Sequence, residues 1–316
     1  MNLQLDRSSE QSCDAGSDIV AQTAAPDILI HLHIPKTGGT SLNSIVQHGF
    51  RNDEVFGIEV FDNMGPELRD GLGLARYDYC LQLRAGYRAE DWGRIRYVTG
   101  HLPFGLHCAF DRRVKYFTVL RHPFDRIISE FFYRIQENNP TRNNGRPLTF
   151  EEYVESHYDI HLSNYQVRVL AGSPGLDDKA VPVERHHLEQ AKRNISEYFL
   201  AAAPLESMAE LALIIRRIYG WPLRRLLTEY KNKTKRRLRA ADIPPRVRKL
   251  VEECNAYDLE LYEWVQKRFA AHCELFEPQL SRDERILSVV SNALNDAGQI
   301  LPWAVRKRIA QMFFYA

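Results

Sequence analysis

The sequence predicts an α/β fold of three layers, in which a mainly parallel central sheet is flanked by helices. Apolar runs typical of strands alternate along the chain with longer segments of helical periodicity, a pattern typical of parallel sheets covered on both faces. Two of these strand-like runs end in a turn that contains Gly or Pro and leads directly into a helix. The 316 residues, 44% hydrophobic and 26% charged, supply enough apolar material for the core of one such domain.

The first predicted strand covers residues 28–34, where apolar side chains alternate with other residues. The chain then passes Pro35, Gly38 and Gly39, and helical spacing begins at Leu42. A strand followed by a glycine-containing turn and a helix directs several main-chain N–H groups at one spot, together with the positive end of the helix dipole. We therefore predict an anion-binding loop at this turn.

Side chains in the same turn add positive charge and further donors. Lys36 supplies an ammonium group, and three hydroxyl side chains follow it. The residues predicted to bind the anion are Lys36, Thr37, Gly38, Gly39, Thr40 and Ser41. In the P-loop of nucleoside triphosphatases the lysine follows the glycines, whereas here it precedes them. At this point a plain strand-to-helix turn with an incidental lysine remains the alternative.

A second motif of the same kind lies at residues 115–129. Residues 115–121 are rich in aromatic and β-branched side chains and predict a strand, and Pro123 is typical of the first position of a helix. Arg121 ends the strand, and Ser129 lies about two turns into the helix. Because an arginine presents a fork of N–H donors that suits a phosphate dianion, this motif predicts a second phosphate site.

The two motifs together resemble those of sulfotransferases that use 3′-phosphoadenosine 5′-phosphosulfate (PAPS), in particular the heparan and dermatan 2-O-sulfotransferases. Residues 35–41 match the 5′-phosphosulfate loop of that family, and residues 120–129 match its 3′-phosphate motif, with Arg121 and Ser129 in the corresponding places. The resemblance spans about residues 27–272. It implies the sulfotransferase variant of the P-loop nucleotide-hydrolase fold, with PAPS as donor and 3′,5′-adenosine bisphosphate (PAP) as product. It also implies an acceptor hydroxyl, on a saccharide or glycoconjugate by family likeness.

Transfer to a hydroxyl requires a base, and His101 is the first candidate. It follows Gly100 at the end of a third strand-like run, residues 94–99, and imidazole titrates near neutral pH. Its position also resembles that of the catalytic histidine of the 2-O-sulfotransferases. His107 is the competing candidate for the base. Lys36 is predicted to be catalytic as well, because it would stabilise charge on the departing phosphate. No metal is predicted, since neither C-x-x-C nor H-E-x-x-H occurs.

Two later segments extend the resemblance. Residues 163–172 are similar to the family's Asn-x-Gln-x-Arg-x-Leu segment, and residues 230–238 to the basic loop that closes over the nucleotide. The residues of this loop that the resemblance assigns to cofactor binding are Asn232, Lys233 and Thr234. A basic run also occurs on solvated or nucleic-acid-binding surfaces, but the net charge of +1 weighs against nucleic acid. Arg142, Arg146 and Arg168 could bind an acidic sugar, or they could be charges on the protein surface, and the sequence does not decide between these roles.

Further elements follow from periodicity and from cap residues. Thr149 and Glu152 form a capping box at the start of a helix that runs to about residue 157. The other predicted elements are helices at 183–195, 206–219 and 244–271 and a strand at 197–203.

We expect a mobile tail over residues 1–25, a sulfotransferase domain over 26–275 and a C-terminal helical extension over 276–316. The last helix of this extension is basic and amphipathic, so it suits a membrane surface or a dimer partner, although docking onto the protein's own core is simpler. The five cysteines are scattered and odd in number, and no apolar run is long enough to cross a bilayer. These features predict a cytoplasmic protein; the alternative is a Golgi-lumenal domain that lacks its anchor.

Two other functions are compatible with a nucleotide-binding fold. A P-loop-like nucleotide kinase would transfer phosphate from ATP with magnesium, and the position of Lys36 argues against it. A non-catalytic nucleotide-binding partner protein would have no need of both Lys36 and His101. The sequence does not distinguish the acceptor, the sulfated position or the oligomeric state.

Overall fold

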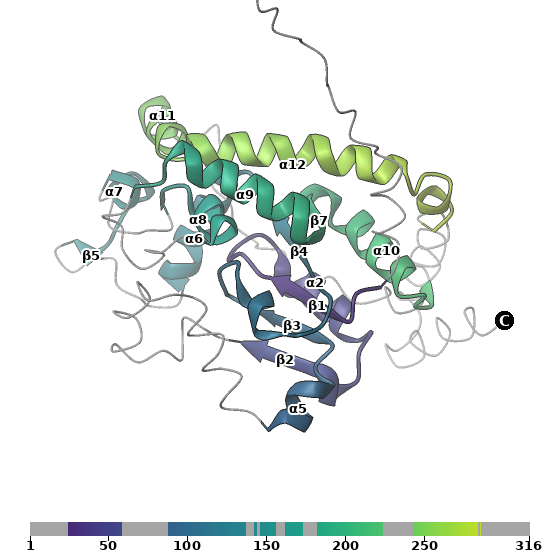
Figure 1. Cartoon of the computed structure of the whole chain (residues 1–316). Helices are drawn as coiled ribbons and strands as arrows, with labels where there is room; N and C mark the ends of the chain where they lie inside the picture. The colour runs from purple at the N-terminus through teal and green to yellow at the C-terminus, as the bar shows by residue number, and fades with distance from the viewer. Residues whose placement is uncertain are drawn as a thin grey trace, which may run out of the picture.

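A five-stranded sheet forms the centre of the computed structural model, which describes residues 25–58, 88–136, 142–143, 146–155, 162–172, 182–223, 243–283 and 285. All neighbouring strands of this sheet are parallel, in the order β2-β3-β1-β4-β7. The strands are β2 (Val55–Ile58), β3 (Tyr97–Gly100), β1 (Ile28–Leu32), β4 (Val114–Leu120) and β7 (Phe199–Pro204). Figure 1 shows them stepping from β2 toward α12 (Ala256–Glu274), which lies against β7. The predicted parallel sheet is confirmed.

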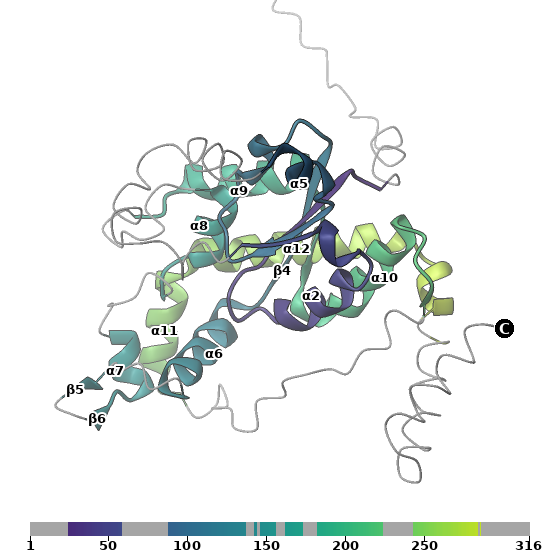
Figure 2. The same ribbon diagram turned by 90° about the horizontal axis from the view of Figure 1, so that it is seen from below.

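Helices cover both faces of the sheet, which confirms the predicted three layers. Figure 2 shows α8 (Tyr165–Ala171) and α9 (Arg185–Tyr198) on one side of the sheet, and α2 (Gly39–Gln47) and α10 (Met208–Ile218) on the other. The remaining described elements are α5 (Ala89–Arg94), α6 (Pro123–Gln136), α7 (Phe150–Glu155), α11 (Pro245–Cys254), the short helices η1 (Asn52–Glu54), η2 (Leu106–Ala109) and η4 (Leu205–Ser207), and the hairpin β5 (Arg142–Asn143) and β6 (Arg146–Pro147).

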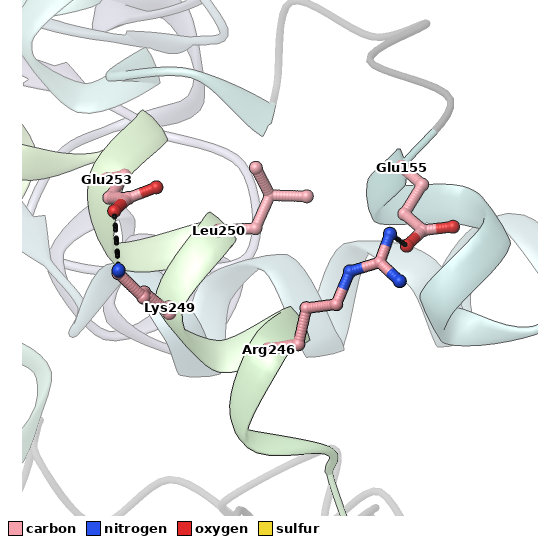
Figure 3. A pocket seen from close by; sticks show the side chains of 5 residues that line it. All are labelled: Glu155, Arg246, Lys249, Leu250 and Glu253. Carbon is pink, nitrogen blue, oxygen red and sulfur yellow. Dashed lines mark ion pairs between the residues drawn. The ribbon is translucent and has the colours of Figure 1, made fainter.

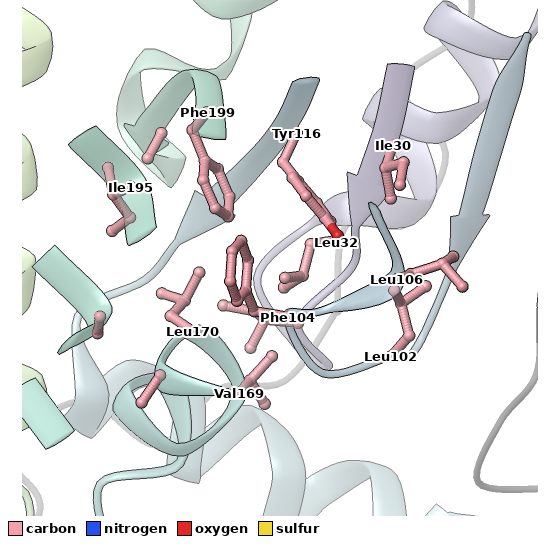
Figure 4. Packing of buried hydrophobic residues seen from close by; sticks show 14 of the residues in the cluster. Ile30, Leu32, Leu102, Phe104, Leu106, Tyr116, Val169, Leu170, Ile195 and Phe199 are labelled. Carbon is pink, nitrogen blue, oxygen red and sulfur yellow. The ribbon is translucent and has the colours of Figure 1, made fainter. Parts of the chain in front are cut away.

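The central position of β1 explains its residue types. All five of its residues are buried, as is usual for a strand of a parallel sheet with helices on both faces. Ile30 and Leu32 pack into the core under α8 and α9 with Phe104 and Tyr116 (Figure 4), whereas Leu29 packs into the core under α2 and α10. A third cluster joins α6, α7 and α11.

The helix predicted over residues 244–271 is divided at Asn255, so the prediction of one continuous helix was wrong there. Asn255 has non-helical dihedral angles (φ −125°, ψ 27°), and its side chain is buried. Its Nδ2 donates to the carbonyl oxygens of Leu162 and Val251 at 2.8 Å each, and its Oδ1 accepts from the main-chain N–H of Asn164 at 3.0 Å. These bonds to a distant segment outweigh the helical periodicity of the local sequence.

Most other predicted elements are confirmed, with shifted ends. The strand predicted from residue 94 begins at Tyr97, because Arg94 belongs to the last turn of α5. The capping box is confirmed: the main-chain N–H of Thr149 donates to Glu152 at 2.8 Å, and that of Glu152 donates to the Thr149 hydroxyl at 3.2 Å. The helix predicted from residue 206 begins at Met208, after η4.

Several predictions lie outside the described residues. They concern the tail before residue 25, the basic loop at 230–238 and the C-terminal helices beyond residue 285. Within the described ranges, none of the helices has the length and apolar character that a bilayer span requires.

Candidate functional site

The carboxyl ends of three neighbouring strands bring the predicted site residues to one edge of the sheet. Leu32 at the end of β1 pairs with Gly100 at the end of β3, and β4 ends at Leu120 on the other side of β1. Lys36, His101 and Arg121 follow these three strands. Because these strands are parallel neighbours, the three residues lie along one edge of the sheet, and this is the edge at which parallel α/β sheets bind ligands.

Two glycines allow the turn after β1 to pack closely against its surroundings. Gly38 has a φ of 83°, a left-handed conformation that favours glycine, and a Cβ there would meet the Leu205 side chain. A Cβ at Gly39 would collide with the imidazole of His33. The space that a side chain would fill is therefore occupied by neighbouring groups, and the backbone itself lines the site.

The start of α2 is the predicted anion site, and its residue types are compatible with that prediction. The N-cap residue, Gly38, has no side chain that could cap the first N–H groups, and no acidic residue lies in the first turn. Thr40 is exposed and Ser41 is half-buried. Thr37 is buried and donates its hydroxyl proton to the carbonyl of Ile34 at 2.8 Å, so its hydroxyl holds the turn together. An anion would then meet Thr37 through its main-chain N–H.

Direct contact joins the two predicted anion sites. The Nη1 of Arg121 donates to the main-chain carbonyl of Lys36 at 3.1 Å. Lys36 has a φ of 68°, which is uncommon for a residue other than glycine, and the bond from Arg121 helps to hold this conformation. Ser129 lies two turns along α6 and is half-buried.

The side chain of Gln166 fixes the backbone of Arg121. Its Oε1 accepts from the Arg121 N–H at 3.0 Å, and its Nε2 donates to the Arg121 carbonyl at 2.9 Å. The sequence singled out the segment that contains Gln166 but assigned none of its contacts. The structure assigns it to the support of the strand end at which Arg121 lies.

Helices α8 and α12 cap one another beneath this support. Both carboxylate oxygens of Asp258 accept from α8, from the N–H of Val167 at 2.8 Å and of Gln166 at 3.1 Å. In return, Asn164 Oδ1 accepts from the N–H groups of Tyr257 and Asp258 at 3.0 Å each. Burial raises the pKa of the Asp258 carboxyl, although these hydrogen bonds oppose the shift. Sequence reasoning missed Asp258, because nothing local to it indicates a partner some 90 residues away.

Three imidazoles form a row from the interior to the site edge. The ring centroids of His31 and His33 lie 5.2 Å apart, and those of His33 and His101 lie 4.5 Å apart. His31 is buried, and its ring stacks on that of Phe117 with a centroid distance of 4.6 Å. Burial, assisted by the charges of His101 and Lys36, lowers the pKa of His33 to about 3. His33 is therefore neutral at physiological pH.

His107 has a different environment from His101. Its main-chain N–H donates to the hydroxyl of Tyr116 at 2.7 Å, and its Nδ1 lies 3.0 Å from the same hydroxyl. Its ring packs against Phe104 and Tyr198, with centroid distances of 4.9 and 4.5 Å. Burial lowers its pKa. His107 thus belongs to an aromatic cluster around Tyr116, whereas His101 contacts the imidazole that packs on Gly39.

Arg168 is not a surface charge. Only 3% of it is exposed, and its Nε donates to the carbonyl of Ser163 at 3.2 Å. It therefore supports the start of α8. The side chains of Arg142 and Arg146 lie outside the described part of the chain, as do Asn232, Lys233 and Thr234. Among the described residues no three His, Cys, Asp or Glu side chains are grouped so as to hold a metal ion.

A separate cavity of about 590 Å³ lies between α7 and α11 (Figure 3). It is lined by Leu250 and by four charged residues, Glu155, Arg246, Lys249 and Glu253. These residues pair with each other, Arg246 with Glu155 at 2.7 Å and Lys249 with Glu253 at 3.6 Å. The cavity shares no residue with the edge at Lys36, His101 and Arg121.

Comparison with known proteins supports a sulfotransferase. The sequence model described as "Sulfotransferase family" matches residues 103–265, which include Arg121, Ser129 and Gln166. No curated protein matches the chain. The crystal structure of a sulfotransferase from Alicyclobacillus acidocaldarius is similar over 76% of this chain and 95% of that chain, with 15% sequence identity and a TM-score of 0.40. Since the family match extends over more than half of the 316 residues, the chain belongs to the sulfotransferase family.

Proposed function

We propose that this sulfotransferase transfers a sulfuryl group from PAPS to an acceptor hydroxyl. The observation that carries the proposal is the hydrogen bond from Arg121 to the Lys36 carbonyl, because it joins two predicted anion sites that lie far apart in the sequence. A single adenosine-based donor with phosphate at both its 3′ and 5′ positions requires two such sites side by side. The glycine at the N-cap of α2 and the absence of acidic residues from the first turn of that helix also suit a phosphosulfate group.

Each anion site has its own part in holding the donor. The α2 N-terminus and Lys36 would hold the 5′-phosphosulfate, and Arg121 with Ser129 would hold the 3′-phosphate. When bound, the donor supplies a sulfuryl group that moves to the acceptor oxygen as its bond to the 5′-phosphate breaks. Lys36 and the main-chain N–H groups are preorganised for the negative charge that then gathers on the phosphate. On resemblance alone, we propose Asn232, Lys233 and Thr234 as further contacts.

We propose His101 as the base that takes the proton of the acceptor hydroxyl. It follows β3 at the same edge as Lys36, and its ring contacts that of His33. Since His33 stays neutral at pH 7, it adds no positive charge beside His101. The hydrogen bonds and ring contacts of His107 with Tyr116 and Tyr198 favour a structural role for that residue.

The His101→Ala substitution tests this role. We expect it to leave PAP affinity unchanged and to lower the rate of sulfuryl transfer by about 10²- to 10⁴-fold, the usual contribution of a general base. Calorimetry gives the affinity, and transfer of ³⁵S from labelled PAPS gives the rate. The matched variant is His107→Ala, which should retain transfer. Full turnover in His101→Ala, or its loss in His107→Ala alone, would assign the base to another residue.

We propose that the acceptor hydroxyl belongs to a saccharide or glycoconjugate, a choice that rests on likeness to the 2-O-sulfotransferases. The test offers labelled PAPS with polysaccharides, glycolipids, simple alcohols and phenols in parallel. Label in a saccharide fraction is the expected result. Label only in the simple alcohols or phenols would contradict this part of the proposal.

We also propose that the protein works in the cytoplasm. Its five cysteines are scattered along the sequence and odd in number, which suits the thiols of a reducing compartment better than a disulfide framework.

A further inference from the structure

The ammonium group of Lys36 lies on an aromatic ring. Its Nζ is 3.7 Å from the ring centroid of Tyr133, which belongs to α6. Tyr133 is four residues beyond Ser129, so both side chains project from the same face of that helix. The helix that begins beside Arg121 therefore presents this face to the turn after β1.

The core does not explain the position of the Tyr133 ring. Tyr133 is 45% exposed, and among the large apolar side chains of the described residues only Leu275 shares this property. The buried side chains of α6 are instead Phe124, Ile127, Ile128 and Phe131. The contact with Lys36 is accordingly a feature of the site and contributes little to packing.

An aromatic ring suits this position better than a carboxylate would. A ring face attracts a cation without neutralising its charge, and the ammonium keeps N–H groups that point away from the ring. A carboxylate would hold Lys36 as firmly but would compete with the phosphate for its charge. A ring can thus order the four rotatable bonds of the lysine side chain while the cation remains able to meet an anion.

We propose that Tyr133 is a positioning residue that preorganises Lys36 for the donor. The main chain of Lys36 is held by Arg121 at 3.1 Å, and its ammonium is held by Tyr133, so both ends of the residue are fixed before an anion arrives. This inference rests on the proposed function, since it assigns Lys36 to the 5′-phosphate of PAPS and PAP.

Calorimetric titration with PAP tests the inference in a set of five proteins. These are the wild type, Tyr133→Leu, Tyr133→Phe, Lys36→Met, and the double variant with Lys36→Met and Tyr133→Leu. We expect Tyr133→Leu to bind PAP about fivefold more weakly than the wild type, and Tyr133→Phe to match the wild type because it keeps the ring. In the Lys36→Met background, Tyr133→Leu should cause no further loss, because the two residues act as a pair.

The outcomes separate this inference from the proposed function. If the wild type does not bind PAP, the proposed function fails. If the wild type binds PAP and Tyr133→Leu binds equally well or more tightly, Tyr133 does not preorganise Lys36. An equal loss with and without Lys36 would mean that the ring acts through another group. Because Tyr133 is partly exposed, Tyr133→Leu should melt within a few degrees of the wild type, and Tyr133→Ala provides a second variant without the ring.

Discussion

The row of His31, His33 and His101 shows how single residues couple packing to the site. His31 packs in the interior, His33 lies against Gly39, and His101 reaches the site edge. The Gly39 backbone leaves room for the His33 ring, and that ring contacts the proposed base. A substitution at any of these positions is therefore expected to move its neighbours.

The free energy of unfolding should fall as the pH drops below about 6.5. Above this pH His33 is neutral in both states. Below it, His33 becomes protonated in the unfolded chain but stays neutral in the folded protein, because burial and the charges of His101 and Lys36 keep its folded-state pKa at about 3. The loss for His33 is about 1.4 kcal/mol per pH unit until the pH approaches 3. The pKa of buried His31 is also lowered, which adds a loss of the same sign.

Urea unfolding at several pH values measures this effect. His33→Phe keeps an aromatic ring but cannot titrate, so its stability should depend less steeply on pH between 6 and 4.5. The exposed His48→Phe controls for the removal of a surface histidine. Equal slopes for the wild type and His33→Phe would show that His33 is protonated in the folded protein.

The sequence predicted those site residues whose place in the fold follows from the strand or helix next to them. Lys36, His101 and Arg121 each follow a strand, and parallel strands bring their carboxyl ends to one edge, so their convergence required no tertiary information. Tyr133 and Asp258 act through contacts with residues far away in the sequence, which the spacing of residues along the chain does not indicate. In the sequence alone, Tyr133 is one of several aromatic residues in the segment that forms α6, and Asp258 resembles any acidic residue near the start of a helix.

The exchange of caps between α8 and α12 determines where these two elements meet. Asp258 satisfies two N–H groups at the start of α8, and Asn164 satisfies two at the start of α12. Gln166, in the first turn of α8, then holds the backbone of Arg121. The junction between α8 and α12 thus positions the end of β4. The residues that form this junction contact no ligand in the proposed mechanism.

Asp258→Ala should destabilise the protein by about 3 kcal/mol, since it leaves two buried N–H groups without acceptors. It should also weaken PAP binding, because the support of Arg121 through Gln166 is loosened. Denaturant unfolding and calorimetry give the two values. Glu260→Ala on the same helix is the control. It removes the ion pairs with Arg185 and Lys192, in which Arg185 and Glu260 are exposed, and should cost less than 1 kcal/mol without changing PAP affinity. Equal behaviour of the two variants would contradict this role of Asp258.

The same junction shows why helix ends were harder to predict than helices. Periodicity correctly indicated helical structure on both sides of Asn255. The break arises from hydrogen bonds to residues 162 and 164, which are close to Asn255 only in the folded chain.

For the whole molecule, the sheet order decides which motifs share a site. β1 lies between β3 and β4, so the segment after it lies between His101 and Arg121. The family match begins at residue 103 and therefore includes Arg121 but neither Lys36 nor His101. The sheet joins these two parts of the chain into one edge. The central claim is that this edge binds one donor that carries phosphate at both the 3′ and the 5′ position of its ribose.

Titration calorimetry with PAP and with ATP, each with and without magnesium, tests that claim most directly. A site built from Lys36, Arg121 and the start of α2 should bind PAP more tightly than ATP, and magnesium should leave PAP binding unchanged. Tighter binding of ATP than of PAP, particularly if it depends on magnesium, would contradict the account and favour a phosphotransferase.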